Sequence, residues 1–110
     1  MPKRRSQSVK RKPTHDLAAI KAAYSDPAKI RRTVTAARDA MAMGFETQDV
    51  VDVIQGMSRR DFDKSATAHN DIRQWMDSYM PVVDGVTLYL KFTTDGDGNL
   101  LLTSFKKADL

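Results

Sequence analysis

Residues 86–107 read VTLYLKFTTDGDGNLLLTSFKK. Over Val86–Phe92 apolar and polar side chains alternate with a period of two, which is typical of a strand with one buried face. The two Asp-Gly pairs at 95–98 favour the positive φ angles of a hairpin turn, and Leu100–Lys106 then predicts a returning strand. The stretch therefore predicts an antiparallel hairpin.

The position of the turn determines which side chains of this hairpin share a face. With a two-residue loop at Asp97-Gly98, Tyr89 lies opposite Lys106, and moving the loop to Asp95-Gly96 slides the pairs but keeps the faces. One face is expected to be core and consists of Leu88, Leu90, Phe92, Leu101, Thr103 and Phe105. The other face carries a phenol and two ammoniums and consists of Tyr89, Lys91, Ser104 and Lys106. It is either a solvated strand face or a phosphate site, where neighbouring ammoniums lower each other's pKa.

Helical patterns precede the hairpin. We expect helices that start at threonine caps and cover residues 14–24, 33–43 and 47–55. A capping box at 58–61 predicts a further short helix that contains Phe62 and Lys64. Helices followed by an antiparallel meander predict an α+β fold, with the helices packed on one face of a small sheet.

Residues 74–83 are ambiguous. Trp75, Tyr79 and Val83 have a helical spacing, whereas Trp75, Asp77 and Tyr79 suit one face of a strand. Pro81 disfavours the interior of either element. Asp84-Gly85 predicts a turn before the hairpin.

The chain has 110 residues and a formal net charge of +4. Residues 1–13 hold six Lys or Arg and no acid, so the rest of the chain is mildly acidic. We expect 1–13 to be a disordered basic tail and 14–110 to be one domain. The chain has no cysteine and no apolar run above four residues, which excludes disulfide scaffolds, membrane spans and signal peptides. A cytoplasmic location is expected.

The second half contains, in order, Asp61–Ser65, the set Trp75, Asp77, Tyr79 and Pro81, then Val86–Lys91 and Ser104–Lys106. These ordered segments resemble the motility quorum-sensing regulator toxin family (MqsR). With weaker likeness upstream, the resemblance covers roughly residues 11–107. It implies a compact ribonuclease fold similar to the RelE and YoeB toxins.

The resemblance also implies a function. The family's members are mRNA interferases of type II toxin–antitoxin systems, which cut messenger RNA at short GC-containing sites without the ribosome. The RNA 2′-hydroxyl attacks the adjacent phosphate and leaves a cyclic phosphate and a 5′-hydroxyl, with no metal or organic cofactor. The implied partner is a cognate antitoxin (MqsA-like) with a zinc-binding N-terminal and a DNA-binding C-terminal domain.

The site residues follow from matching positions. The resemblance assigns catalysis to Lys64, Tyr89 and Lys106. Accessory roles are expected for His69, Lys91 and Gln74, and RNA contacts for Lys91, Lys107 and Trp75. No residue is expected to bind a metal.

Three positions depart from the family's pattern. Met76 stands where the family has glutamine, so a contact to the RNA there is lost or moves to Gln74. His69 replaces a tyrosine, and Asp63 replaces an aromatic residue before Lys64. Two other functions stay open: a non-catalytic nucleic-acid-binding module that uses the basic tail, and a degenerate toxin that only binds its antitoxin.

Overall fold

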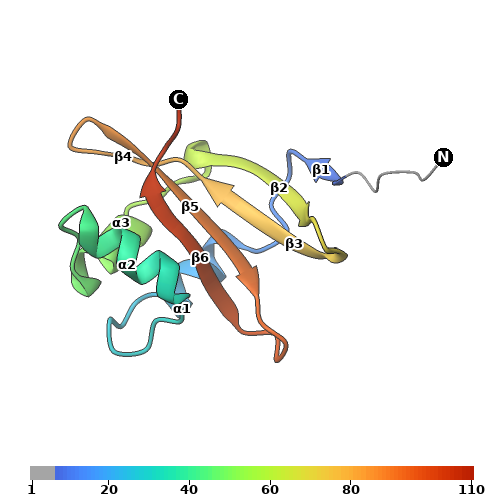
Figure 1. Ribbon diagram of the computed structural model, residues 1–110, viewed down its shortest axis with the longest axis horizontal. Helices are drawn as coiled ribbons and strands as arrows, with labels where there is room; N and C mark the ends of the chain where they lie inside the picture. The colour runs from blue at the N-terminus through green and yellow to red at the C-terminus, as the bar shows by residue number, and fades with distance from the viewer. Residues whose placement is uncertain (1–6) are drawn as a thin grey trace.

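Figure 1 shows the computed structural model of the protein, which describes residues 7–110. The helical elements are α1 (Leu17–Ala23), α2 (Val34–Ala42), α3 (Thr47–Gln55) and the 3₁₀ turn η1 (Arg59–Asp61). The strands are β1 (Val9–Lys10), β2 (Phe62–Ala68), β3 (Asp71–Tyr79), β4 (Val82–Val83), β5 (Val86–Thr94) and β6 (Leu100–Lys107). All strand pairs are antiparallel, and the order is β1-β2-β3-β5-β4 with β6 also on β5. The α+β prediction is confirmed.

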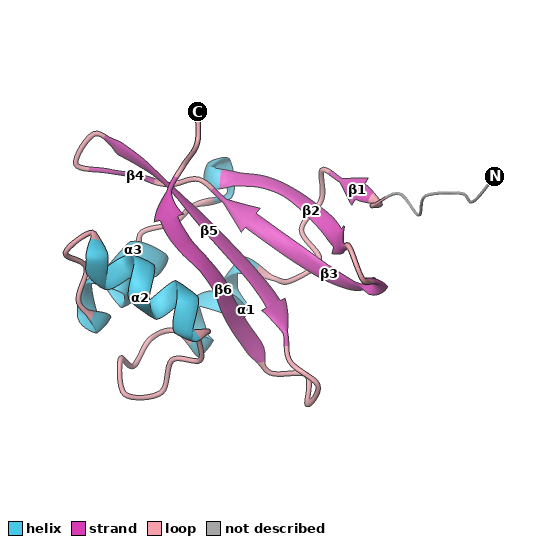
Figure 2. Ribbon diagram, in the orientation of Figure 1, coloured by secondary structure: helices cyan, strands magenta, loops and turns pink. Residues whose placement is uncertain are grey.

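The three helices gather at one side of the sheet (Figure 2). They bury one of its faces, and the shared core consists of Ile20, Tyr24, Ala36, Ala40, Val50, Val53, Ile54, Met57, Tyr79, Leu88, Leu90, Phe92, Leu102 and Phe105. We call the side of the sheet that meets this core the helix side, and the opposite side the open face. Because successive side chains along a strand point to opposite faces, every second residue lies on the helix side and the others lie on the open face.

The start of α1 differs from the prediction. Asp16, not Thr14, caps the helix, and its carboxylate accepts a hydrogen bond from the Ala18 amide at 3.3 Å. The Thr14 hydroxyl is instead 2.7 Å from the Ser65 hydroxyl of β2. The Thr14 side chain, which the local sequence offered as a helix cap, is thus used in a tertiary contact. Residues 14–16 stay outside the helix and lie against the sheet.

The next two helices begin close to where they were predicted. The Thr33 hydroxyl caps α2 by accepting from the Ala36 amide at 3.1 Å. Thr47 is the first residue of α3, but its hydroxyl accepts from the Arg32 guanidinium at 2.9 Å and does not cap the helix. The Asp49 carboxylate, which accepts from the Glu46 amide at 2.8 Å, closes that end instead.

The prediction of a short helix that contains Phe62 and Lys64 is wrong. The capping contact itself is present, since the Asp61 carboxylate accepts from the Ser58 amide at 2.8 Å. The chain completes only one 3₁₀ turn and enters β2 at Phe62, because pairing with β3 satisfies the backbone beyond that point. Residues 71–79 take the strand alternative, with Tyr79 opposite Phe62.

The predicted disordered tail needs a correction as well. Residues 1–6 lie outside the described residues, but Val9 and Lys10 form β1 opposite Ala66 and Ser65. The Ser8 amide also donates to the Thr67 hydroxyl at 2.9 Å. An edge strand is held through its backbone and needs few apolar side chains, so composition did not reveal it. The structured part therefore begins before residue 14.

The hairpin confirms the predicted register at its base, where Tyr89 pairs with Lys106 and Lys91 with Ser104. Past Lys91 the register shifts so that Phe92 pairs with Leu102, which leaves Thr103 as the extra residue of a β-bulge. The prediction that Leu101 and Thr103 belong to the core is therefore wrong, and Leu102 is buried in the core instead.

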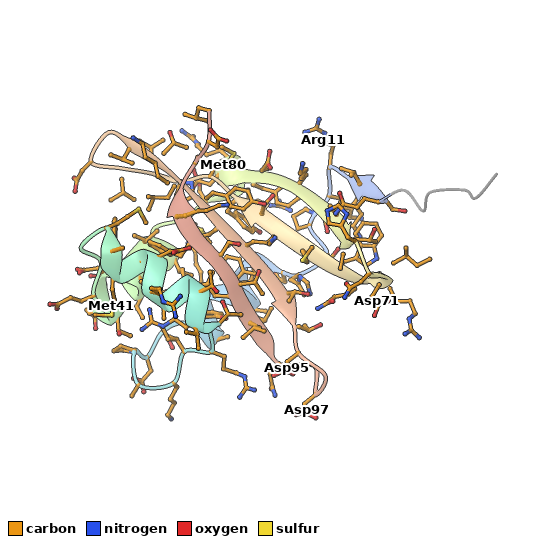
Figure 3. The ribbon with its side chains drawn as sticks, in the orientation of Figure 1. Arg11, Met41, Asp71, Met80, Asp95 and Asp97 are labelled. Carbon is orange, nitrogen blue, oxygen red and sulfur yellow. The ribbon has the colours of Figure 1, made fainter. Side chains whose placement is uncertain are left out.

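The tip of this hairpin is a longer loop than predicted. Thr94 pairs with Leu100, so no two-residue loop forms. The Asp95 carboxylate accepts from the amides of Asp97 and Asn99 at 2.9 and 3.0 Å, and both aspartates lie at the exposed end of the hairpin (Figure 3).

Candidate functional site

A row of cross-strand partners spans the open face of the sheet. Lys64 of β2 lies opposite Ser78 of β3, and Ser78 lies opposite Lys91 of β5. Lys91 in turn lies opposite Ser104 of β6. Directly paired residues project to the same face, so lysine and serine alternate across four strands. Lys64 and Lys91 are two strand spacings apart, or about 10 Å between Cα atoms.

Tyr89 and Lys106 extend this row along the hairpin. They pair with each other two residues away from Lys91 and Ser104, before the bulge changes the register. The Lys106 ammonium lies 5.6 Å from the centre of the Tyr89 ring. The fold thus brings together the three predicted catalytic residues and Lys91.

A β-bulge directs Lys64 to this face. Phe62 pairs with Tyr79 and Lys64 with Ser78, so Asp63 is an extra residue in β2. Without a bulge, residues 62 and 64 would point to the same side. Phe62 packs on Tyr79 on the helix side, with ring centres 5.5 Å apart, whereas Lys64 joins the row on the open face. Sequence analysis missed this bulge, and the only local signal was a charged residue inside the strand.

Asp63 and Ser78 form a part-buried polar contact within the row. The Ser78 hydroxyl is 3.0 Å from the Asp63 carboxylate, to which it donates, and 3.2 Å from the Lys64 carbonyl oxygen. Ser78 is only 2% exposed. Sequence analysis missed both roles, because neither residue type is diagnostic and the contact spans two strands.

The environment raises the pKa of the Tyr89 phenol. Burial is the main cause, and the negative charge of Asp63 adds to it, while hydrogen bonding to the Ser78 side chain acts in the opposite direction. The phenol is therefore protonated at neutral pH and is suited to donate a proton.

The pKa of Lys91 is lowered. Its half-buried position is the main cause, and the positive charge of Lys106 contributes. Partial burial disfavours the ammonium, so Lys91 releases a proton more readily than a solvated lysine does.

Two expected accessory residues lie away from the row. His69 occupies the exposed turn between β2 and β3, five residues from Lys64, which corresponds to about 16 Å along a strand. Gln74 is on β3 four residues before Ser78, about 13 Å away, and lines a shallow hollow with Asp95 at the hairpin tip.

The two remaining expected RNA contacts do not lie on the open face. Trp75 alternates in phase with Asp77 and Tyr79, so its side chain projects to the helix side. There the Lys10 ammonium lies 4.3 Å from the centre of the Trp75 ring. Lys107 pairs with the core residue Leu88, so it is directed to the side opposite Lys106. Met76, on the open face opposite Ala66, offers a thioether where the resemblance places an amide.

Asp77 anchors the chain ahead of α1 on the helix side. This fully buried carboxylate accepts from the backbone amides of Thr14 and His15, at 3.1 and 2.7 Å, and contacts the His15 ring at 3.2 Å. Burial raises its pKa, but the hydrogen bonds from His15, Ser65 and Thr14 outweigh burial and leave the pKa lowered. Asp77 and His15 are thus structural partners.

Within residues 7–110, no three His, Asp or Glu side chains cluster as metal ligands. In the same part of the chain no helix is long and apolar enough to cross a membrane.

Comparison with known proteins shows the family to which the chain belongs. The family described as motility quorum-sensing regulator, toxin of MqsA, matches residues 12–107. The mRNA interferase toxin MqsR of Escherichia coli (strain K12) is 35% identical over 79 residues, which cover 72% of this chain and 79% of the relative. The match includes the strands that carry Lys64, Tyr89 and Lys106. The chain belongs to the motility quorum-sensing regulator toxin family.

Proposed function

We propose that this chain is the toxin of a toxin–antitoxin pair and acts as an endoribonuclease on messenger RNA. The observation that carries the proposal is the gathering of Lys64, Tyr89, Lys91 and Lys106 on one open face of the sheet. Membership of the toxin family and the similarity to a protein named as an mRNA interferase support it.

Cleavage would follow the transesterification of RNA. The 2′-oxygen forms a bond to the adjacent phosphorus as the bond to the 5′-oxygen breaks. Lys91, whose pKa is lowered, is the group suited to accept the 2′-hydroxyl proton, and Tyr89, whose pKa is raised, is suited to protonate the leaving 5′-oxygen. Lys64 and Lys106 would hold the phosphate and stabilise the charge that develops on it.

These side chains supply a base, an acid and positive charge for each step. We therefore propose that the reaction needs neither a metal ion nor an organic cofactor. His69, at the far end of β2, has no part in this scheme.

The partner of a toxin in this family is a cognate antitoxin, and the family description names MqsA in that role. We propose an antitoxin of that kind, with zinc-binding and DNA-binding domains. The toxin would act in the cytoplasm, where messenger RNA is translated.

The test is cleavage of a defined single-stranded RNA with GC-containing sites by the purified protein in EDTA. We expect fragments with 2′,3′-cyclic phosphate and 5′-hydroxyl ends, and growth arrest when the protein is expressed in bacteria without an antitoxin. Absence of cleavage together with harmless expression would contradict the proposal.

A degenerate toxin is the second candidate, because Met76 removes an amide from the open face. Such a protein would bind an antitoxin but cut nothing. Toxicity of the wild type that disappears in Lys64→Ala would exclude it.

A further inference from the structure

A groove of about 840 Å³ opens on the helix side, away from the row of lysines. It lies between the chain that leads into α1 and the start of β2, and its floor includes Phe62 and Tyr79. Its basic lining residues are Arg11, Lys12, Lys21 and Arg59. None of the residues assigned to the cleavage chemistry lines it.

The lining is strongly positive for a chain whose main body is mildly acidic. Against its four Lys and Arg, the only acidic lining residue is Asp16, whose carboxylate is engaged as the cap of α1. Within residues 7–110 none of these four cations forms an ion pair. Arg11 points away from the body of the protein beside β1 (Figure 3). Unpaired cations around one concavity attract an anionic ligand.

The floor is aromatic and carries one polar atom. Tyr79 is 1% exposed, and its side chain lines the groove beside Phe62. Burial raises the pKa of Tyr79 to about 12, so the hydroxyl remains a donor at neutral pH. A donor within an apolar floor, ringed by cations, suits a nucleotide chain with its phosphates on the rim.

The groove and the open face meet at one edge of the sheet. Phe62 lines the groove and Lys64 joins the open face, and their Cα atoms are about 7 Å apart along the bulged strand. β1 pairs with Ser65 and Ala66, and among the described residues no strand pairs with the outer edge of β2 at residues 62–64. A single strand of RNA has a short path around this edge.

We propose that the groove binds the phosphate backbone of the RNA that flanks the cleavage site, after the strand passes around the free edge of β2. The inference rests on the proposed function, because RNA is the ligand of the open face. It gives the RNA a second contact with the protein, in the groove on the helix side. Only an RNA long enough to reach both the open face and the groove makes this contact, so affinity depends on RNA length.

The test compares a short RNA that covers only the cleavage site with one extended by about ten nucleotides on both sides. The groove variant is Lys12→Gln/Arg59→Gln. The matched control is Lys29→Gln/Arg38→Gln, which removes the same charge from exposed residues that line neither the groove nor the open face. Binding is measured with all-2′-O-methyl RNA, which has no free 2′-hydroxyl, and cleavage with ordinary RNA.

We expect the groove variant to bind the long RNA about tenfold more weakly, with a salt slope smaller by about 1.4, or 0.7 per lost phosphate contact. Its preference for the long over the short RNA in kcat/KM should fall by a similar factor. The control should keep both the affinity and the preference.

Equal losses in the groove and control variants would overturn the inference, since they would report net charge alone. Wild-type binding that does not depend on RNA length would also overturn it. If the wild type cleaves neither RNA, the proposed function fails, and the 2′-O-methyl binding data still decide whether the groove holds RNA.

Discussion

Ser78 donates a hydrogen bond to Asp63 at 3.0 Å, and in the row on the open face it lies between Lys64 and Lys91. The two residues act on Tyr89 in opposite directions, since the Asp63 charge raises the pKa of the phenol and the Ser78 hydroxyl lowers it. The pair therefore adjusts the pKa of the candidate acid, in addition to burial, which is the main cause of its shift.

Opposite pH shifts are the first prediction. If Tyr89 must be protonated, activity falls at high pH as the phenol ionises. Asp63→Asn should move this alkaline limb to lower pH, and Ser78→Ala should move it to higher pH, as measured by kcat against pH. A purely structural role for both residues would lower kcat without moving the limb, or would move it in the same direction in both variants.

Removal of the candidate catalytic groups is the second prediction. Tyr89→Phe should lower kcat by about 10²- to 10⁴-fold, because it removes only the proton that the phenol donates. Lys64→Ala should lower kcat/KM by a similar factor through loss of charge at the phosphate. Cleavage rates and circular dichroism are measured together, with exposed Lys29→Ala as the control. Full activity in both variants with an intact fold would show that the site lies elsewhere.

The sequence predicted the elements whose evidence is local. Alternation over Val86–Phe92 was enough to find the hairpin and to pair Tyr89 with Lys106, because one buried face fixes the register near the base. The same local evidence produced the right capping contact at Ser58 and Asp61. The same alternation is enough to put Tyr89 and Lys106 on one face of the hairpin.

Contacts between distant segments were not predictable in this way. The bulge at Asp63 depends on how β2 pairs with β3, yet it decides which face Lys64 occupies. The strand at Val9–Lys10 depends on a partner more than fifty residues away in the sequence. Ser78 became a candidate only when pairing placed it between Lys64 and Lys91. Each of these features depends on how strands pair with one another. Such pairing joins residues at no fixed spacing in the sequence, so no local pattern predicts it.

Acid sensitivity of folding is the third prediction, and it concerns Asp77. The pKa of this carboxyl is lower in the folded than in the unfolded chain, so its stabilising contribution is full above the unfolded value of about 4. It is lost as pH falls below that value toward the folded pKa. Asp77→Asn should lower the free energy of unfolding at pH 7 by about 2–4 kcal/mol, because its amide group faces the backbone donors of Thr14 and His15.

Urea denaturation between pH 2 and 7 measures this effect. The difference in stability between the wild type and Asp77→Asn should shrink as pH falls below about 4, where the wild-type carboxyl also becomes neutral. Asp109→Asn, at an exposed position near the C-terminus, serves as the control for general charge effects. A difference that stays constant over this range would contradict the role assigned to the Asp77 charge.

Restoring an amide at position 76 is the fourth prediction. Met76 is half-buried on the open face, on the same strand as Ser78, and its thioether forms at most weak hydrogen bonds. Met76→Gln provides a donor and an acceptor there, so we expect kcat/KM to rise several-fold on at least one RNA sequence, with little change in stability. The measurement is cleavage of a panel of RNAs that differ in the bases around the cut site. As a control, Met76→Leu keeps the side chain apolar and should leave the preference unchanged. A Gln variant that cuts every RNA as the wild type does would show that position 76 does not face the bound strand.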